Sequence, residues 1–277
     1  MQSVKTWLKR HFAHWLYRSR CSASAGEQFR SWVAAAASQR PVFRVEEVSR
    51  DLFTYHGEDG IIAFLLGQLD SVSPSFIDIG AGDCIKSNCA SLAVHAAWDG
   101  CFLDADNGQL QTGRNFYKRI NNRKGRLSFI NTHITPDNVN QVIGAAGFSG
   151  EAGLLSIDID GNDYWIWKAI DIIRPRIVII EAKVEFGTGN RLVSYGHHNH
   201  HSSDSMYNGA SVEALRILGL QKGYKLVAAN KQGYNLFFVQ QQEPVKELTT
   251  AEVLKDPVTQ QSVYPASFFD RHSFLKS

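Results

Sequence analysis

An apolar segment that runs into an acid and two closely spaced glycines constrains the fold of this chain most. Residues 75–92 read SFIDIGAGDCIKSNCASL, so a strand containing Asp78 leads through Gly80 and Gly82 into a helix-like stretch. Glycines at these positions allow a tight turn and a close approach of the backbone to a ligand. The helix that follows directs its unpaired N–H groups toward the same place. The stretch therefore predicts the first strand, turn and helix of a nucleotide-binding sheet.

The alternation of strands and helices continues over residues 51–240. An amphipathic helix is expected at GEDGIIAFLLGQL, strands then alternate with helices through RIVIIEAKVEF, and KLVAAN and NLFFVQ form a final strand pair. This order predicts an α/β fold with a doubly wound, mostly parallel seven-stranded sheet, helices on both faces and an antiparallel edge strand. A polar loop is expected at 187–208.

We expect three parts in the chain. These are an N-terminal helical extension with a linker over 1–50, the α/β domain over 51–240, and a polar C-terminal extension over 241–277. A length of 277 residues suits one main domain. The segment CSASAGEQFRSWVAAAASQRP is predicted to be a linker followed by a short helix that ends before Pro41.

The first twenty residues, MQSVKTWLKRHFAHWLYRSR, are interpreted as a basic amphipathic helix. They contain five basic residues and no acid, and Trp7 and Trp15 lie at or near the apolar face. This composition is typical of helices that lie on a membrane surface. Packing of the helix on its own domain or on a partner is the alternative.

Charge and cysteine content limit the partners and the compartment. The net charge is +2, and the chain without residues 1–20 is net acidic, so no nucleic-acid partner is expected. The four cysteines show neither paired CxxC nor zinc-site spacing, which favours a reduced setting. No apolar run approaches the roughly 20 residues that a membrane span needs. We expect a cytoplasmic protein, at the inner face of the membrane where residues 1–20 bind it, with its oligomeric state open.

The acid that ends the second predicted strand favours a nucleoside ligand. Asp104 in CFLDAD follows Gly80 by 24 positions, close to the roughly 20 expected for an acid that binds ribose hydroxyls. Ile85 stands where a dinucleotide-binding turn carries its third glycine, so the pyrophosphate fingerprint is incomplete. The alternative is an ordinary βα turn followed by a surface acid.

These motifs resemble those of the class I S-adenosylmethionine-dependent methyltransferases, and the nearest group is FkbM-like. Over roughly 51–240, Asp78, Gly80 and Gly82 match the first motif and Asp104 matches the ribose acid. The resemblance implies a Rossmann-like methyltransferase sheet, S-adenosylmethionine as cofactor, and modification of a sugar or polysaccharide.

The chain departs from that family pattern at two places. Cys84 stands where many members have a third glycine, and Ala182-Lys183 stands where Tyr-Asn is expected. The second departure weakens any transfer of substrate contacts from the family. His133, at the end of the third predicted strand, is assigned to the border of the adenine, with a buried structural histidine as the alternative.

Acidic residues follow the fourth and fifth predicted strands. Asp158 and Asp160 lie in SIDIDGNDYW, and Glu181 lies in IIEAKVE. The carboxyl ends of these strands flank the ligand crevice of an open α/β sheet. Carboxylate oxygens from two strand ends suit Mg²⁺ or Mn²⁺, so the three are candidate metal ligands and catalytic residues. Alternatively, Asp158 and Asp160 cap the next helix.

A histidine-rich loop follows the fifth predicted strand, where class I methyltransferases commonly place substrate-facing segments. The loop YGHHNHHSSDSMYN contains four of the ten histidines: His197, His198, His200 and His201. Histidine titrates near neutrality and can accept a proton from an alcohol. We assign His198 as a competing catalytic base, and a solvated polar loop without a role is the alternative.

Together, these features predict an O-methyltransferase that acts on a hydroxyl of a sugar or glycan, including a lipid-linked one. Asp158, Asp160 or Glu181 would orient or deprotonate the acceptor, directly or through a metal. A metal-dependent glycosyltransferase is the main rival, because Asp158-x-Asp160 also resembles the motif that holds Mn²⁺ on a nucleotide sugar. A non-catalytic glycan-binding or scaffold protein is the second rival.

Overall fold

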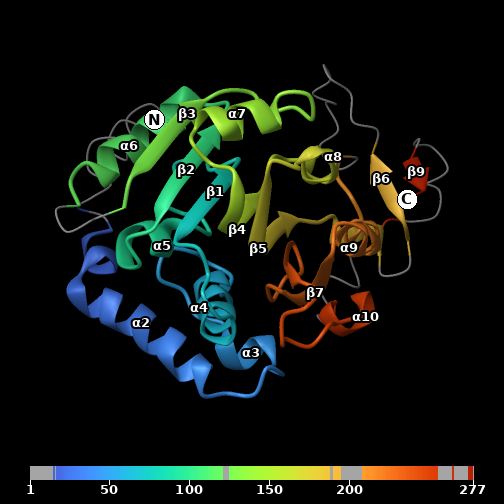
Figure 1. Ribbon diagram of the computed structural model, residues 1–277, viewed down its shortest axis with the longest axis horizontal. Helices are drawn as coiled ribbons and strands as arrows, with labels where there is room; N and C mark the ends of the chain where they lie inside the picture. The colour runs from blue at the N-terminus through green and yellow to red at the C-terminus, as the bar shows by residue number, and fades with distance from the viewer. Residues whose placement is uncertain are drawn as a thin grey trace.

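The computed structural model describes residues 15, 17–120, 125–187, 190–194, 208–254, 264 and 274–276. Its centre is a seven-stranded sheet with the order β3-β2-β1-β4-β5-β8-β7 (Figure 1). The strands of this sheet are β1 (Ser75–Ile79), β2 (Asp99–Asp104), β3 (Leu127–Asn131), β4 (Gly150–Ile157), β5 (Ile173–Glu181), β7 (Tyr224–Ala229) and β8 (Asn235–Gln240).

The strand directions confirm the predicted fold class. β1 pairs in parallel with β2 and β4, β2 with β3, and β4 with β5. The closing hairpin adds the antiparallel strands, because β8 runs antiparallel to both β5 and β7. The chain leaves β1 in one direction toward β3 and returns on its other side with β4. This switch point opens a ligand crevice at the carboxyl ends of β1 and β4.

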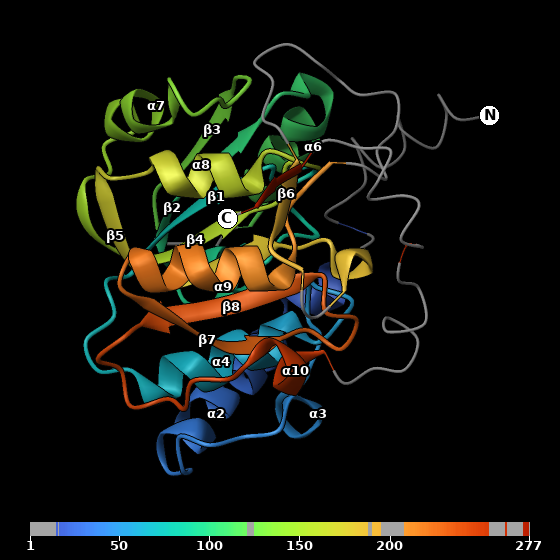
Figure 2. The same ribbon diagram turned by 90° about the vertical axis from the view of Figure 1, so that its right-hand side faces the viewer.

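Helices cover both faces of the sheet (Figures 1 and 2). The helices and 3-10 turns of the described residues are η1 (Arg18–Cys21), α2 (Ala23–Ala37), α3 (Val45–Val48), α4 (Glu58–Gln68), α5 (Ala90–His95), α6 (Asn107–Tyr117), α7 (Val139–Ala145), α8 (Asp163–Ala169), η2 (Val184–Phe186), α9 (Val212–Gln221) and α10 (Thr250–Val253). In the described part of the chain, no helix is long and apolar enough to span a membrane.

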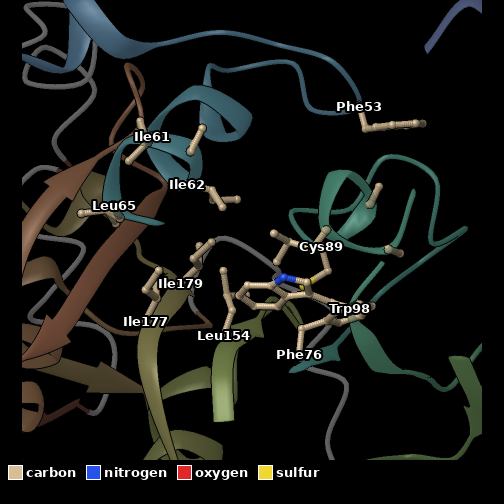
Figure 3. Close-up of a cluster of buried hydrophobic side chains, with 14 of the residues drawn as sticks. Phe53, Ile61, Ile62, Leu65, Phe76, Cys89, Trp98, Leu154, Ile177 and Ile179 are labelled. Atoms are coloured by element: carbon tan, nitrogen blue, oxygen red, sulfur yellow. The ribbon is translucent and has the colours of Figure 1, made fainter. Parts of the chain in front are cut away.

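Two hydrophobic clusters lie on opposite faces of the sheet because alternate strand residues point to opposite sides. Phe76 belongs to the cluster with α2, α4, α5 and α6, whereas Ile77 belongs to the cluster with α7, α8 and α9. Figure 3 shows the first cluster, where Ile62 of α4 lies over Leu154 of β4 and Ile179 of β5. Both faces of the sheet are therefore covered, as a parallel sheet requires.

The N-terminal part of the chain is more ordered than its composition predicts. A linker and short helix were expected over residues 21–41, and that expectation is wrong, because α2 spans fifteen residues. The amphipathic pattern expected for α4 is also wrong, since all residues from Glu58 to Leu65 are buried. The reason is that α2 covers the outer side of α4 while the sheet covers its inner side (Figure 2).

A small second sheet replaces part of the polar loop expected at 187–208. β6 (Leu192–Ser194) pairs antiparallel with β9 (Phe274–Lys276), close to the C-terminus of the chain. The predicted strand RIVIIEAKVEF is also shorter than expected, because β5 ends at Glu181 and η2 follows. The chain therefore turns away at Glu181, which leaves this residue at the carboxyl edge of the sheet.

Gly67 permits the close packing of α4 on α2, and its replacement is the first test of this architecture. A Cβ atom at Gly67 would lie 2.4 Å from the carbonyl oxygen of Val33 and 2.6 Å from the Cβ of Ala36. We expect Gly67→Ala to lower the free energy of unfolding by about 1–3 kcal/mol, because the two helices must separate. Urea unfolding measures this change. The exposed Glu27→Ala in α2 is the control, and an equal effect of both substitutions would contradict the packing.

Candidate functional site

The glycine turn after β1 is wedged against the end of β4. Gly80 has φ of 83° and Gly82 has φ of 54°, both in the left-handed region that favours glycine. A Cβ atom at Gly80 would lie 1.7 Å from the carbonyl oxygen of Asp158, so this position accepts glycine only. The N–H groups of Gly80 and Ala81 both donate to the carbonyl oxygen of Leu103 in β2, at 2.9 and 3.0 Å. The turn is thus fixed to both neighbouring strands.

Asp104 lies against the glycine turn, as the sequence predicts. One oxygen of its carboxylate accepts a hydrogen bond from the Gly82 N–H at 2.7 Å, and the other accepts from the Asp106 N–H at 2.7 Å. The side chain is half-buried. An acid at the end of β2 is therefore fixed beside the turn and remains within reach of a ligand in the crevice.

Cys84 occupies a backbone conformation that usually requires glycine. Its φ is 59°, and its side chain is buried. Gly113 of α6 makes room for it, because a Cβ atom there would lie 2.7 Å from the Cβ and 2.8 Å from the Sγ of Cys84. Tyr117 donates a hydrogen bond to the Cys84 carbonyl oxygen at 2.8 Å. Burial, followed by the nearby charge of Asp78, raises the pKa of the thiol well above its usual value, so Cys84 acts as a packing residue.

Asp78 forms the buried end of a cavity of about 210 Å³ beneath the turn. Only 3% of the residue is exposed, and its carboxylate accepts a hydrogen bond from the Ser87 hydroxyl. Burial raises the pKa of Asp78 to about 6, although hydrogen bonds from Ser87 and Ser156 lower it. Gly80 and Asp158 line the same cavity. The turn and the end of β4 therefore open into one space.

The segment before α4 forms one wall of this cavity, a feature that the sequence did not reveal to us. Thr54, Tyr55 and His56 line it. The buried carboxylate of Asp59 holds the segment in place: its Oδ2 accepts from the backbone N–H groups of Leu52, Phe53 and Thr54 at 2.8, 2.8 and 2.9 Å. Its Oδ1 accepts from the Ser91 hydroxyl. An acid in the first turn of α4 was the only available sequence signal.

Glu58 connects this wall to the hairpin of β7 and β8. Its Oε1 accepts hydrogen bonds from Asn230 Nδ2 at 2.9 Å and from Asn235 Nδ2 at 3.1 Å. Its Oε2 accepts from the His56 N–H at 3.0 Å. Asn235 pairs with Glu181 in the register of β8 with β5. The wall therefore reaches the carboxyl end of β5 through one buried carboxylate.

The structure brings Asp158, Asp160 and Glu181 together, as the sequence predicts. One carboxylate oxygen from each lies within 4.8 Å of the others. Asp160 has φ of 57°, and Asp163 fixes this bend by accepting hydrogen bonds from the N–H groups of Ile159 and Gly161 at 2.9 and 3.0 Å. Asp163 thus takes the local backbone N–H groups, while Asn162 at the N-cap of α8 makes no side-chain cap bond. The helix-capping alternative for Asp158 and Asp160 is wrong.

The three carboxylates form a donor set that fits a hard divalent cation. Burial raises the pKa of Asp158 to about 7, with contributions from Asp163 and Asp160, even though the residue keeps an exposed edge. Burial and the charge of Asp158 raise the pKa of Glu181 to about 9. Three convergent carboxylate oxygens that repel one another suit Mg²⁺ or Mn²⁺, because a divalent cation offsets the repulsion.

The other candidate residues are less closely tied to the cavity. His133 is exposed, so the alternative of a buried structural histidine is wrong, and its carbonyl oxygen accepts from Asn138 Nδ2 at 2.9 Å. Trp167 is buried and packs on Phe238, as expected of a core residue. The four loop histidines, including His198, lie outside the described residues.

No protein-family model and no curated protein sequence matches this chain. Three solved structures are similar to it. An O-methyltransferase family protein from Burkholderia thailandensis is 10% identical, with 68% of this chain and 60% of that chain covered and a TM-score of 0.42. Magnesium protoporphyrin IX methyltransferase from Synechocystis PCC 6803 with bound SAH is 12% identical, with coverages of 66% and 81% and a TM-score of 0.43. An O-methyltransferase from Bacillus cereus in complex with SAH is 16% identical, with coverages of 78% and 90% and a TM-score of 0.44. This chain spans less than two thirds of the first of these proteins.

The contact between Cys84 and Gly113 predicts a coupled pair of substitutions. Gly113→Ala should lower the free energy of unfolding by about 1–3 kcal/mol, because the new methyl group overlaps the Cys84 side chain. Cys84→Gly removes that side chain and should recover part of the loss. The interaction energy in a double-mutant cycle should be about 1 kcal/mol or more, measured by urea unfolding. Simple additivity of the two changes would contradict the proposed contact.

The raised pKa of Asp78 predicts a pH-dependent stability. The folded pKa of about 6 exceeds the usual 3.8, so the protonated group's stabilising contribution is complete below about pH 4 and is lost as the pH rises through 6. Asp78→Asn does not titrate and should gain stability over the native protein by about 3 kcal/mol across this range. Urea unfolding from about pH 4 to about pH 8 measures the difference. A difference that is constant with pH, or that falls, would show that Asp78 is not held in a desolvated site.

Proposed function

We propose that the chain is an S-adenosylmethionine-dependent O-methyltransferase that methylates a hydroxyl group of a sugar or glycan. One observation carries this proposal: the glycine turn, the buried Asp78 and the first acid after β4 all line one cavity at the switch point of the sheet. That is the place where open α/β sheets bind ligands. The family resemblance of the sequence motifs supplies the methyl donor.

The residues around the turn support binding of a nucleoside with an amino-acid tail. In this proposal Asp104 accepts hydrogen bonds from the ribose hydroxyls, and the N–H groups of the turn face the ligand. Asp78 closes the cavity below the turn. Lys86 lines the same cavity, and its ammonium is suited to the carboxylate of the methionine tail. His133 would border the adenine from the end of β3.

Methyl transfer needs alignment and the loss of one proton. The acceptor oxygen attacks the methyl carbon, the carbon–sulfur bond breaks with its electron pair going to sulfur, and the hydroxyl proton passes to a base. The products are a methyl ether and S-adenosylhomocysteine. A base with a pKa near neutrality is efficient, and Asp158, with its pKa raised to about 7, is our candidate. Glu181 orients the acceptor beside it, and His198 is the competing base.

Asp158, Asp160 and Glu181 would hold Mg²⁺ or Mn²⁺ in this proposal. When bound, such a cation lowers the pKa of an acceptor hydroxyl that coordinates it. The protein itself fixes the spacing of the three carboxylates through Asp163, whose two hydrogen bonds set the bend at Asp160. The metal requirement is separable from the methyltransferase proposal.

Binding of the donor tests the proposed function. Calorimetry should detect S-adenosylhomocysteine with a dissociation constant in the micromolar range, and Asp104→Ala should weaken it by about tenfold or more. Asp106→Ala is the matched control, because Asp106 caps α6 two residues further along the chain. Its affinity should change by less than about twofold. Absence of binding to the native protein, or equal losses in both variants, would contradict the proposal.

Chelation tests the metal. EDTA should reduce the methyl-transfer rate by about tenfold or more, and added Mg²⁺ or Mn²⁺ should restore it. Asp160→Asn should cause a similar loss that added metal does not restore, because a ligand oxygen is removed. Asp171→Asn, an exposed acid outside the trio, is the control. A rate that EDTA leaves unchanged removes these three residues as ligands.

The convergence of Asp158 and Asp160 also favours a second candidate function, a metal-dependent glycosyltransferase. In that case the two carboxylates would hold Mn²⁺ on the diphosphate of a nucleotide sugar. Calorimetry against UDP with and without Mn²⁺ distinguishes the two. Manganese-dependent UDP binding without binding of S-adenosylhomocysteine would favour this alternative.

We further propose an FkbM-like enzyme that contacts the inner face of a membrane through residues 1–20. Trp15 is 70% exposed, which suits an interfacial side chain. Residues 1–14 lie outside the described part of the chain. Deletion of residues 1–20 should reduce pelleting with anionic liposomes, and unchanged pelleting would favour packing of this segment within the protein.

A further inference from the structure

A second and larger cavity lies next to the proposed donor cavity. Its volume is about 790 Å³, within the range of roughly 300–1,000 Å³ that is common for small-molecule sites. Its walls come from residues 41–57, from the end of β7 with the turn that follows, and from the segment that carries α10. Figure 2 shows α3 and α10 side by side at this edge of the molecule.

The two cavities share a wall. Tyr55 and His56 line both of them. Asn230 lines the large cavity and Asn235 the small one, and both donate to the same carboxylate oxygen of Glu58. A molecule bound in the large cavity therefore lies on the opposite side of Tyr55 and His56 from the glycine turn, and its end can reach the donor only past these two residues.

The wall is held in place. Asp59 binds three successive backbone N–H groups of the segment, and Asp51 accepts hydrogen bonds from the Thr54 hydroxyl and the Gly57 N–H, both at 2.8 Å. Such a rigid partition can orient a ligand, because a bound molecule then has one direction of approach to the donor. The large cavity is thus positioned by the same contacts that build the small one.

The charges of the lining indicate a neutral ligand. Among the described lining residues, three cations are balanced by three acids: Arg44, Lys231, Lys246, Glu46, Asp51 and Glu252. Lys246 pairs with Glu252 at 2.9 Å, and Arg44 lies 3.9 Å from Glu46. A cavity without an excess of one sign does not concentrate ions of the other sign. A phosphorylated or strongly acidic ligand therefore fits this lining poorly.

The remaining lining groups suit a hydroxylated molecule with apolar faces. Val42 is 62% exposed and Tyr55 is 49% exposed, although both side chains are large and apolar, so a ligand face can cover them. The Oε1 atom of Gln232 and the Oγ atom of Ser49 are buried without a hydrogen-bond partner among the described residues, and both residues line the cavity. Acceptor oxygens of this kind call for a donor such as a hydroxyl group.

We propose that this cavity is the acceptor chamber and that it takes a neutral, hydroxylated molecule of the glycoside class. The inference rests on the proposed methyltransferase function. The sugar ring lies against Tyr55 and Val42, and one hydroxyl passes His56 to reach the donor. The oxygen of that hydroxyl gains the methyl group, sulfur keeps the electron pair of the broken bond, and the proton passes to the base.

A substitution at the rim tests the chamber. Val42→Trp should fill part of the cavity without disturbing the fold, because this side chain is largely exposed. Gln141→Trp on α7 is the matched control, since Gln141 is exposed and lines neither cavity. With neutral methyl glycosides as acceptors, Val42→Trp should reduce kcat/KM by about tenfold or more, mainly through KM. The affinity for S-adenosylhomocysteine should change by less than about twofold in both variants.

Two measurements keep the inference separate from the proposed function. Ligand-observed NMR with methyl glycosides, in the presence of S-adenosylhomocysteine, should show binding to the native protein and to Gln141→Trp but not to Val42→Trp. No glycoside binding to the native protein, or equal binding to Val42→Trp, overturns the acceptor chamber. Glycoside binding that Val42→Trp abolishes, without any binding of S-adenosylhomocysteine, keeps the chamber and overturns the proposed function.

A panel of acceptors tests the ligand class. Neutral methyl glycosides should be methylated faster than the corresponding uronic acids or sugar phosphates, because the charges of the lining are balanced. Simple phenols should be poor acceptors, because they lack the several hydroxyl donors that Gln232 and Ser49 can meet. Faster methylation of phenols or of the acidic sugars would overturn the assignment of a neutral glycoside.

Discussion

Gly80 lies so close to the end of β4 that a Cβ atom there would stand 1.7 Å from the carbonyl oxygen of Asp158. The turn after β1 is therefore in direct contact with the residue that begins the acidic trio. Hydrogen bonds from Gly80 and Ala81 to Leu103 fix the same turn to β2. Because three strands meet at this point, the proposed cofactor turn, the ribose acid at the end of β2 and the carboxylates after β4 form one rigid unit.

The second constraint is the attachment of the segment before α4 to this unit. Asp59 binds the segment through its backbone, and Glu58 joins it to the hairpin that ends the sheet. Both carboxylates are almost fully buried, so their hydrogen bonds are costly to lose. The N-terminal third of the chain thereby completes the proposed donor cavity and also forms one side of the larger cavity beside it.

The strand alternation, the glycine turn, Asp104 and the meeting of Asp158, Asp160 and Glu181 could be predicted because each depends on local pattern or on a general property of parallel sheets. The wall of the cavity could not. Asp59 finds Ser91 across 32 residues of chain, and Glu58 finds Asn230 across 172, so no local pattern signals either contact. Cys84 is similar, because the space for its side chain comes from Gly113 on another helix. The burial of α4 was missed because α2 covers it only in the folded protein.

A crystal structure of the protein with S-adenosylhomocysteine tests the central claim most directly. The account predicts ribose hydroxyls on the carboxylate of Asp104, the amino-acid tail in the cavity bounded by Asp78 and Tyr55, and the sulfur directed toward Asp158. A ligand bound away from the turn of Gly80 and Gly82, or one whose sulfur faces away from Asp158, would contradict it.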